Sequence, residues 1–209
     1  NGPNAVTAAL KEAQEAGVTI VYVDSAANFP AVQTLATDNT AAGATAGKEL
    51  LNALKGSGVN AGTIGIISVN SATASTVARE AGFRKAFEGT GFTLLETQYC
   101  DGDAARSKDM SANFITQGVV GLFGANEGST VGVGNAIAEA GRAVIGVGFD
   151  KSDMILSLIK SGHLLATMAQ NPDVMGYEGI KSAYKALKGE KVSPDYYDTG
   201  VSVLTKADL

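Results

Sequence analysis

Short apolar runs that end in polar residues recur along the chain, and each is followed by a segment with helical periodicity. Such runs are typical of β-strands in a parallel sheet whose two faces are both covered. Strands that alternate with helices of about 10–15 residues predict βαβ units with right-handed crossovers, and so an open α/β sheet. The five clearest runs occupy residues 18–28, 63–75, 93–103, 119–127 and 143–153.

The segments between these runs carry the spacing expected of helices. In residues 4–17, Val6, Leu10 and Ala13 share one face. Residues 40–56 are rich in small side chains, which allow a helix to lie close to a sheet or to another helix. No helix shows a large apolar stripe that would indicate a dimer. The other predicted helices cover residues 76–88, 107–117, 130–140, 151–160 and 172–189, and a closing strand covers 199–206.

Two places have the pattern of a crossing between two lobes. Residues 37–39 and residues 170–172 each follow an apolar run and precede the start of a helix. The chain also opens with a predicted helix that has no strand before it, although a helix in a βαβ protein normally follows a strand. We therefore expect that further sequence precedes Asn1 in the natural protein.

Composition narrows the possible functions. The chain has 209 residues, a net charge of -5 and 45% hydrophobic residues, which suffices for the core of one large or two small domains. The negative charge argues against nucleic acid as a partner, because nucleic acid requires a basic patch. No apolar run reaches the length of a membrane span. No signal-peptide pattern is present, as is also true of a mature secreted chain.

Single cysteine and histidine residues limit the possible chemistry. Cys100 is the only cysteine, which excludes an internal disulfide and weighs against zinc, and we expect it to be a buried or half-buried apolar residue. His163 is the only histidine, and we expect it in a surface turn rather than in catalysis. Asp101 and Asp103 are expected to be solvated turn residues. The sequence therefore predicts no metal and no cofactor.

The polar residues at the ends of the apolar runs are hydrogen-bonding groups rather than nucleophiles. Asp24, Asn126 and Asp150 follow predicted strands, at the edge where open α/β sheets bind ligands. The two aspartates could instead cap the helices that follow them. Residues 132–141 fail the dinucleotide-binding spacing, and no phosphate loop is present. A carboxylate pair for glycoside hydrolysis is not excluded, but nothing positions one, so we expect a binding protein and not an enzyme.

Seven stretches, in chain order, read VTIVYVDSAAN, ATDNTAAGATAGKEL, AREAGFRKAF, VVGLFGANE, IGVGFD, LATMAQNP and ALKGEK. Together they resemble the periplasmic sugar-binding proteins of the ribose-binding type, which serve ABC importers. The resemblance covers the whole chain and implies an α/β, periplasmic-binding-protein-like fold. Two Rossmann-like lobes with parallel sheets, joined by three crossings, would hold the sugar between them. The family's first two βα units and third strand have no counterpart here, so the first lobe would be incomplete.

The resemblance also implies which residues contact the sugar. Asp24 would accept hydroxyl groups, Arg79 would donate from the binding helix, and Phe149 stands where the family keeps an aromatic residue. Ribose binders of the family carry an arginine at the position of Ser25 and a stacking aromatic residue at that of Gly102. These two departures leave the identity of the sugar open. The implied ligand-binding residues are Asn1, Asp24, Arg79, Asn126, Phe149, Asp150 and Gln170.

Three more of these residues, besides the two aspartates, have structural alternatives. Arg79 could be a surface ion-pair partner of Glu80 or Glu88. Asn126 could serve only to order its own loop, and Gln170 could be only a hinge residue.

The function implied by the resemblance is that of an extracytoplasmic solute-binding protein. It would capture a monosaccharide and deliver it to the membrane subunits of an ABC importer, as a monomer in the periplasm or at the cell surface, with or without a lipid anchor. The alternatives are the effector domain of a LacI-type transcriptional regulator and the sensor module of a receptor. The first lobe would comprise residues 1–37 and 171–200, and the second lobe residues 39–169 with the closing strand 201–209. With part of the cleft wall missing, this chain alone would bind sugar weakly or not at all.

Overall fold

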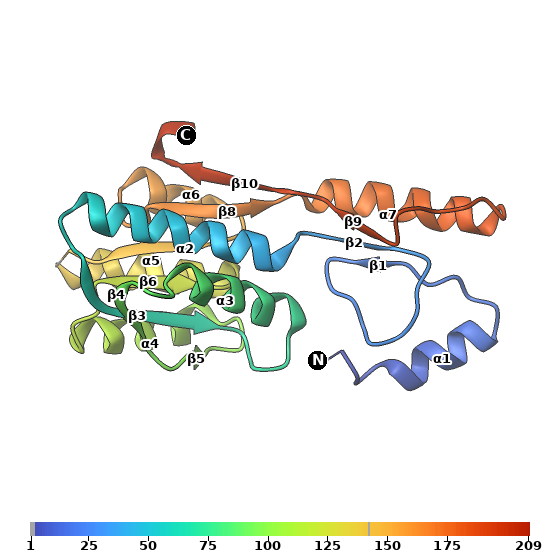
Figure 1. Cartoon of the computed structure of the whole chain (residues 1–209), viewed down its shortest axis with the longest axis horizontal. Helices are drawn as coiled ribbons and strands as arrows, with labels where there is room; N and C mark the ends of the chain where they lie inside the picture. Colours follow the sequence, from blue (N-terminus) through green and yellow to red (C-terminus); the bar gives the residue numbers. More distant parts are fainter. Residues whose placement is uncertain (1–2, 142) are drawn as a thin grey trace.

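The computed structural model describes residues 3–141 and 143–209 of the chain. They form two sheets that follow one another along the long axis of the molecule (Figure 1). The helices are α1 (Thr7–Glu15), α2 (Asn39–Gly56), α3 (Ala74–Ala86), α4 (Ala104–Thr116), α5 (Glu127–Ala140), α6 (Asp153–Lys160), α7 (Pro172–Leu187) and the 3-10 turn η1 (Lys206–Asp208). The strands are β1 (Tyr22–Val23), β2 (Thr34–Ala36), β3 (Ala61–Ser68), β4 (Gly91–Leu94), β5 (Gln98–Tyr99), β6 (Gly121–Gly124), β7 (Ile145–Phe149), β8 (Ala166–Gln170), β9 (Tyr196–Asp198) and β10 (Val201–Thr205).

The larger sheet has the strand order β10-β8-β7-β6-β3-β4, with the short β5 also paired to β3. Its strands from β8 to β4 are parallel, as the alternation of strands and helices predicts. The closing strand β10 is the exception, because it runs antiparallel to β8 with Val201 opposite Gln170. Only Thr199 and Gly200 connect β10 to β9 of the other sheet, with no helix between them. The strand β10 therefore starts beside the carboxyl end of β8 and runs in the opposite direction.

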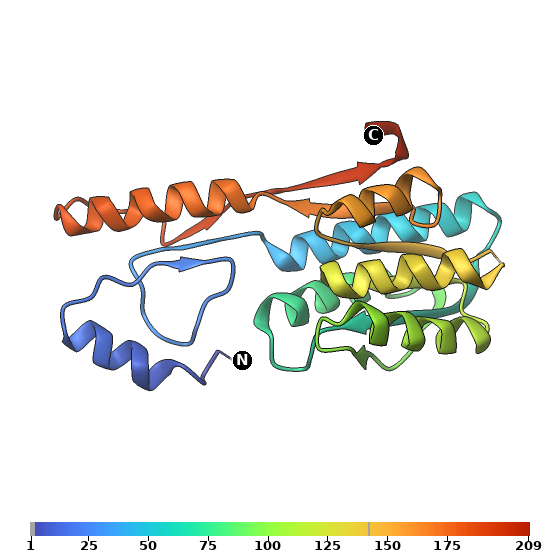
Figure 2. The ribbon, with the colours of Figure 1, turned by 180° about the vertical axis from the view of Figure 1, so that it is seen from behind.

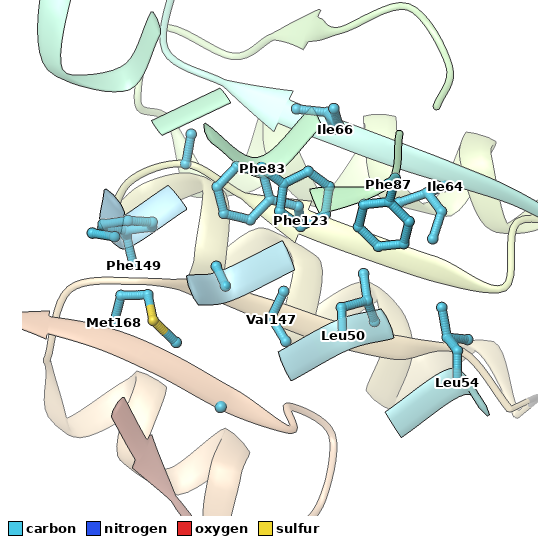
Figure 3. Packing of buried hydrophobic residues seen from close by; sticks show 14 of the residues in the cluster. Leu50, Leu54, Ile64, Ile66, Phe83, Phe87, Phe123, Val147, Phe149 and Met168 are labelled. Carbon is cyan, nitrogen blue, oxygen red and sulfur yellow. The ribbon is translucent and has the colours of Figure 1, made fainter. Parts of the chain in front are cut away.

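Helices cover both faces of the larger sheet (Figures 1 and 2). Side chains of α2 and α3 fill one face, and side chains of α4, α5 and α6 fill the other. On the first face the rings of Phe83 and Phe123 stack with centroids 4.2 Å apart, and Phe149 meets Phe123 at 6.0 Å (Figure 3). Each of these rings is fully buried, and burial of such a side chain contributes about 1.5–3 kcal/mol.

Two glycines let α2 and α3 pack with their backbones in close contact. A Cβ atom on Gly43 of α2 would lie 2.0 Å from the carbonyl oxygen of Arg79. A Cβ atom on Gly82 of α3 would lie 2.0 Å from the carbonyl oxygen of Thr40. The close approach agrees with the small residues of the 40–56 segment, and it fixes the position of α3 and therefore of Arg79.

The smaller sheet has the order β1-β2-β9, and its strands are parallel. The helix α7 packs on this sheet through Met175, Gly179 and Ser182, and the Ser182 hydroxyl donates to Gln33 Oε1 at 2.5 Å. The apolar run 18–28 contributes only Tyr22–Val23 as strand, and β2 and β9 were not predicted. Three crossings connect the two sheets: β2 to α2, β8 to α7, and β9 to β10.

The outer face of α7 is apolar and open to solvent, so the expectation that no helix carries such a stripe was wrong. Tyr177, Ile180, Tyr184 and Leu187 are between 60% and 76% exposed. The predicted face of α1 is likewise only partly covered, since none of the residues of α1 is buried. Periodicity shows that a helix has an apolar face, but it does not show that another element covers that face.

Candidate functional site

A cleft of about 660 Å³ lies between the two sheets, at the carboxyl ends of β1, β7 and β8. Its volume falls within the range of small-molecule sites. Carboxylate, amide and ammonium groups line it together with a few apolar side chains, so it offers both hydrogen-bonding and apolar surface. The lining residues are Val23, Asp24, Glu127, Asp150, Lys151, Gln170, Asn171, Pro172, Asp173 and Met175.

Asp150 is held on both carboxylate oxygens where β7 ends. Its Oδ2 accepts from the Glu127 amide at 2.8 Å, and its Oδ1 accepts from Gln170 Nε2 at 2.6 Å. Its backbone adopts φ 74°, a left-handed conformation that aspartate tolerates better than most residues. A carboxylate has about four lone-pair sites, so two remain for a ligand in the cleft.

Asp24 occupies the corresponding position in the smaller sheet, directly after β1. It also has a left-handed backbone, with φ 70°, and its amide donates to the carbonyl of Leu35 at 2.9 Å. Its side chain is exposed and lines the same cleft as Asp150. The cleft therefore has one strand-end aspartate from each sheet, and neither of the two is the N-cap of the helix that follows it, since Asp38 caps α2 and Ser152 caps α6.

Asn126 directly precedes α5 and caps it. Its Oδ1 accepts from the Ser129 amide at 3.2 Å and from the Ser129 hydroxyl, which forms a capping box. Its Nδ2 donates to no acceptor among the residues that the structure describes, and a Cβ atom on Gly102 would lie 3.5 Å from it. Loop ordering is thus one role of Asn126, and its free amide group is available for a second role toward a ligand.

Gln170 connects the cleft to the crossings between the sheets. Its Nε2 donates to Asp150, and its Oε1 accepts from the buried Thr37 hydroxyl at 3.0 Å. Two further hydrogen bonds tie the crossings together: Tyr196 Oη donates to the Thr37 carbonyl at 2.9 Å, and Asn171 Nδ2 donates to the Thr199 carbonyl at 2.9 Å. Burial raises the pKa of Tyr196, with smaller contributions from Asp198 and Asp38, so its hydroxyl remains a donor at neutral pH.

Replacing Thr37 with valine is expected to lower the free energy of unfolding by about 1–3 kcal/mol, because the change leaves the Gln170 carbonyl without its buried donor. Thr37 is 1% exposed, so water cannot replace the lost hydroxyl. Urea unfolding followed by circular dichroism measures the difference. Thr45→Val is the control, since the exposed Thr45 hydroxyl donates only within its own helix. Equal losses in the two variants would contradict the hinge role of Thr37.

Arg79 and Phe149 lie beneath the cleft and not in its lining. Arg79 is 3% exposed and Phe149 is fully buried. The Phe149 ring packs between the core and the Arg79 guanidinium, whose Cζ lies 4.3 Å from the ring centroid, so ligand contacts of Phe149 and Arg79 stay predictions. Arg79 also forms no surface ion pair with Glu80, which pairs with Arg84 at 2.8 Å.

The other singled-out residues take structural positions. Asp101 pairs with Arg106 at 2.6 Å, and Asp103 caps α4, so both lie in an exposed turn. Cys100 is fully buried, and burial raises the pKa of its thiol. His163 lies in a turn beside the Ser161 hydroxyl. No cluster of metal-ligating side chains occurs in residues 3–141 and 143–209. Asn1 lies outside the described residues.

Sequence reasoning missed several lining residues. Glu127 contributes its backbone amide to Asp150, a role that carries no side-chain signal. Lys151, which follows Asp150 directly, brings a positive charge to the cleft. Its position directly after the sequence Gly148-Phe149-Asp150 was the one signal that could have identified Lys151 as a lining residue.

Comparison with known proteins places the chain in a class. Residues 1–191 match the family described as "Periplasmic binding protein domain", and the chain belongs to that family. None of the described helices has the length and apolar character needed to cross a membrane.

Individual relatives narrow the class further. The chain is 32% identical to the ribose import binding protein RbsB of Haemophilus influenzae over 191 residues, which cover 90% of this chain and 64% of that protein. It is 31% identical to the D-allose-binding periplasmic protein of Escherichia coli, with 76% of this chain and 51% of that protein covered. The chain thus spans about two thirds or less of the length of these curated relatives.

Solved structures agree with this placement. A carbohydrate transporter solute-binding protein from Agrobacterium radiobacter, in complex with D-arabinose, matches with a TM-score of 0.92 and 34% identity, over 98% of this chain and 72% of that one. An ABC transporter solute-binding protein from Agrobacterium vitis, bound with α-D-tagatopyranose, matches with a TM-score of 0.92 and 28% identity, over 99% and 73%. These relatives favour transport over the LacI-type alternative.

Proposed function

We propose that the protein captures a monosaccharide in the cleft between its two sheets and delivers it to the membrane subunits of an ABC importer. The observation that carries this proposal is the pair of strand-end aspartates, Asp24 and Asp150, which line one cleft from opposite sheets. The sugar-bound state of the relatives from Agrobacterium and the import role of the ribose-binding relatives support it.

The proposed ligand contacts suit a neutral polyhydroxyl compound. A sugar hydroxyl donates and accepts at once, so it pairs with the carboxylates of Asp24 and Asp150 and with the amides of Asn126 and Gln170. A hydroxyl of the wrong stereochemistry would leave one of these groups unpaired, at a cost of about 1–3 kcal/mol. The site would therefore select a sugar by the arrangement of its hydroxyl groups.

We also propose a two-lobe organisation for the protein and an extracytoplasmic location. The two sheets correspond to two lobes, with residues 1–37 and 171–200 in the first, residues 39–169 in the second, and the closing strand 201–209 added to the second. Lobe closure around the sugar by bending at the three crossings would produce the form that the importer recognises. We infer an extracytoplasmic location, a monomeric state and no catalytic activity from the periplasmic import proteins that the chain resembles.

A sugar panel tests the function. A ligand at 100 times its Kd stabilises the native state by about 2.7 kcal/mol, and about 2–4 °C per kcal/mol for a chain of this size gives a melting-temperature rise of roughly 5–10 °C. We expect such a rise with one of D-ribose, D-arabinose, D-allose or D-tagatose at tens of millimolar, since weak affinity is expected for this chain. Glycerol at equal concentration is the control. A response equal to that of glycerol from every sugar would contradict the proposal.

A further inference from the structure

The lining of the cleft is strongly acidic. Its carboxylates come from both lobes: Asp24 and Asp173 from the first, and Glu127 and Asp150 from the second. Among the described residues that line the cleft, Lys151 is the one cation. Like charges repel one another across a cleft, and they do so more strongly between protein walls than in open water. Closure of the two lobes around a neutral sugar is therefore opposed by the charges of the walls, unless a cation compensates them.

A second positive charge, that of Arg79, lies beneath the cleft. Burial lowers the pKa of Arg79, and the negative charges of Asp150 and Asp24 oppose this shift. The charge of Arg79 thus acts on one aspartate of each lobe. Asp173, in the first turn of α7, is a further carboxylate of the first lobe, and Lys151 is the cation that shares the cleft lining with it.

The backbone of Lys151 is fixed on both sides, whereas its side chain is not. Asp150, which precedes it, is held on both carboxylate oxygens. Ser152, which follows it, caps α6 by accepting from the Ile155 amide. The Lys151 side chain is exposed, and no carboxylate of the described residues lies within ion-pair distance of its ammonium group. The ammonium group can therefore turn toward the opposite wall from a well-defined starting point.

Asp173 is the carboxylate of the first lobe that best suits Lys151 as a partner. Its side chain is exposed and lines the same cleft. Lys151 comes one residue after Asp150, and Asp173 comes three residues after Gln170, and Gln170 Nε2 donates to Asp150 at 2.6 Å. The segments that carry the two charges therefore meet at this hydrogen bond. Asp24, the other carboxylate of the first lobe, is assigned to sugar hydroxyls in the proposed function.

We propose that Lys151 is a positioning residue, whose ammonium group attracts Asp173 across the cleft and so favours closure of the two lobes around the sugar without donating to the sugar itself. This inference rests on the proposed sugar-binding function. Lysine suits the role because its compact charge is carried on a flexible stem, which can follow the opposite wall as the lobes move. Salt screens such an attraction, since the Debye length is about 30 Å at 0.01 M and about 3 Å at 1 M ionic strength.

The test measures affinity by calorimetry at low and high salt, with D-ribose, D-arabinose, D-allose and D-tagatose as probes. An exposed ion pair contributes a factor of about two to five, so Lys151→Met should weaken binding by that factor at about 0.01 M salt and by less than about 1.5-fold at 1 M. Lys151→Glu should weaken it about tenfold at low salt, because reversing a charge changes the interaction twice as much as removing it. Lys160→Met and Lys160→Glu are the matched controls, since Lys160 ends α6 and is not among the lining residues. They alter the net charge equally and should leave the affinity within about 1.5-fold.

A double-mutant cycle identifies the partner of Lys151. When Asp173→Asn has already removed the attraction, Lys151→Met should weaken binding by less than about 1.5-fold at low salt, because the cycle isolates the interaction between the two residues. An undiminished effect of Lys151→Met in the Asp173→Asn variant would overturn the assignment of Asp173 as the partner.

X-ray scattering of the unliganded chain gives a readout that does not need a sugar. We expect a larger radius of gyration for Lys151→Glu than for Lys160→Glu at low salt, and equal radii at 1 M salt, because the added like charge holds the lobes apart only where it is unscreened. If no sugar binds the unmodified chain, the proposed function fails while the scattering still decides the role of Lys151, and equal radii at low salt would overturn that role. An affinity loss in Lys151→Met that persists at 1 M salt would show a direct contact with the sugar and would also overturn it.

Discussion

Exchanging Asp150 for alanine is expected to weaken sugar binding by about 100-fold or more. Two lone-pair sites of its carboxylate are open to sugar hydroxyls, each hydrogen bond to a charged group contributes about 1.5–3 kcal/mol, and 1.4 kcal/mol is a factor of ten. The variant loses the proposed acceptor for the sugar, and it also leaves the Glu127 amide and Gln170 Nε2 without their partner. The second loss matters because Gln170 links the cleft to Thr37 at the first crossing. Calorimetric titration with the best sugar of the panel measures the change.

Asp150→Asn should have a smaller effect, about tenfold, because the Gln170 amide can turn over. Its oxygen would then accept from the introduced side-chain amide, while its nitrogen donates to the Thr37 hydroxyl. The matched control is Asp101→Ala. Asp101 also follows a strand with a left-handed backbone, at φ 54°, but its side chain pairs with Arg106 on the surface. The two alanine variants share the backbone strain, so they differ in the partners that each carboxylate loses, which lie in the cleft for Asp150 and on the surface for Asp101. Equal affinities in the two alanine variants would remove Asp150 from the site.

The order and type of the main elements were predictable because they follow from local patterns. The predicted helices begin and end within a few residues of α2 to α7, and the strand-end positions of Asp24 and Asp150 follow from the apolar runs before them. The parallel pairing of the larger sheet was also predicted, but the antiparallel β10 was not. Its direction depends on a crossing from the other sheet, and no local pattern records it.

The roles of Arg79 and Phe149 depend on tertiary contacts that a sequence does not display. The Arg79 acceptors Asn39 and Ala125 lie 40 and 46 positions away in the chain. Phe149 is the last residue of β7 and its ring enters the core, whereas Asp150 follows the strand with a left-handed backbone, φ 74°, and lines the cleft. A resemblance in sequence identified loops that border the cleft, but it could not tell which side chain of each loop lines it.

Gly82→Ala is expected to destabilise the protein by about 3 kcal/mol, the upper part of the usual range for overpacking. A Cβ atom at this position would lie 2.0 Å from the Thr40 carbonyl oxygen and 2.9 Å from the Ala44 amide nitrogen, and neither backbone atom can move without shifting α2. The melting temperature should fall by roughly 6–12 °C, at about 2–4 °C per kcal/mol for a chain of this size. Differential scanning calorimetry measures both quantities.

The control for this change is Gly176→Ala, in α7, where a Cβ atom would meet nothing within 4 Å. Alanine there should stabilise the helix by about 0.5–1 kcal/mol, because glycine loses more backbone entropy on folding. The two substitutions are expected to change stability in opposite directions because of packing alone, since both glycines lie inside helices. The consequence for function follows from the same geometry: Arg79 lies on α3, three residues before Gly82, and its carbonyl oxygen lies against Gly43. If Gly82→Ala folds, it should therefore also weaken sugar binding, whereas an unchanged affinity would show that the α2–α3 contact does not set the position of the site.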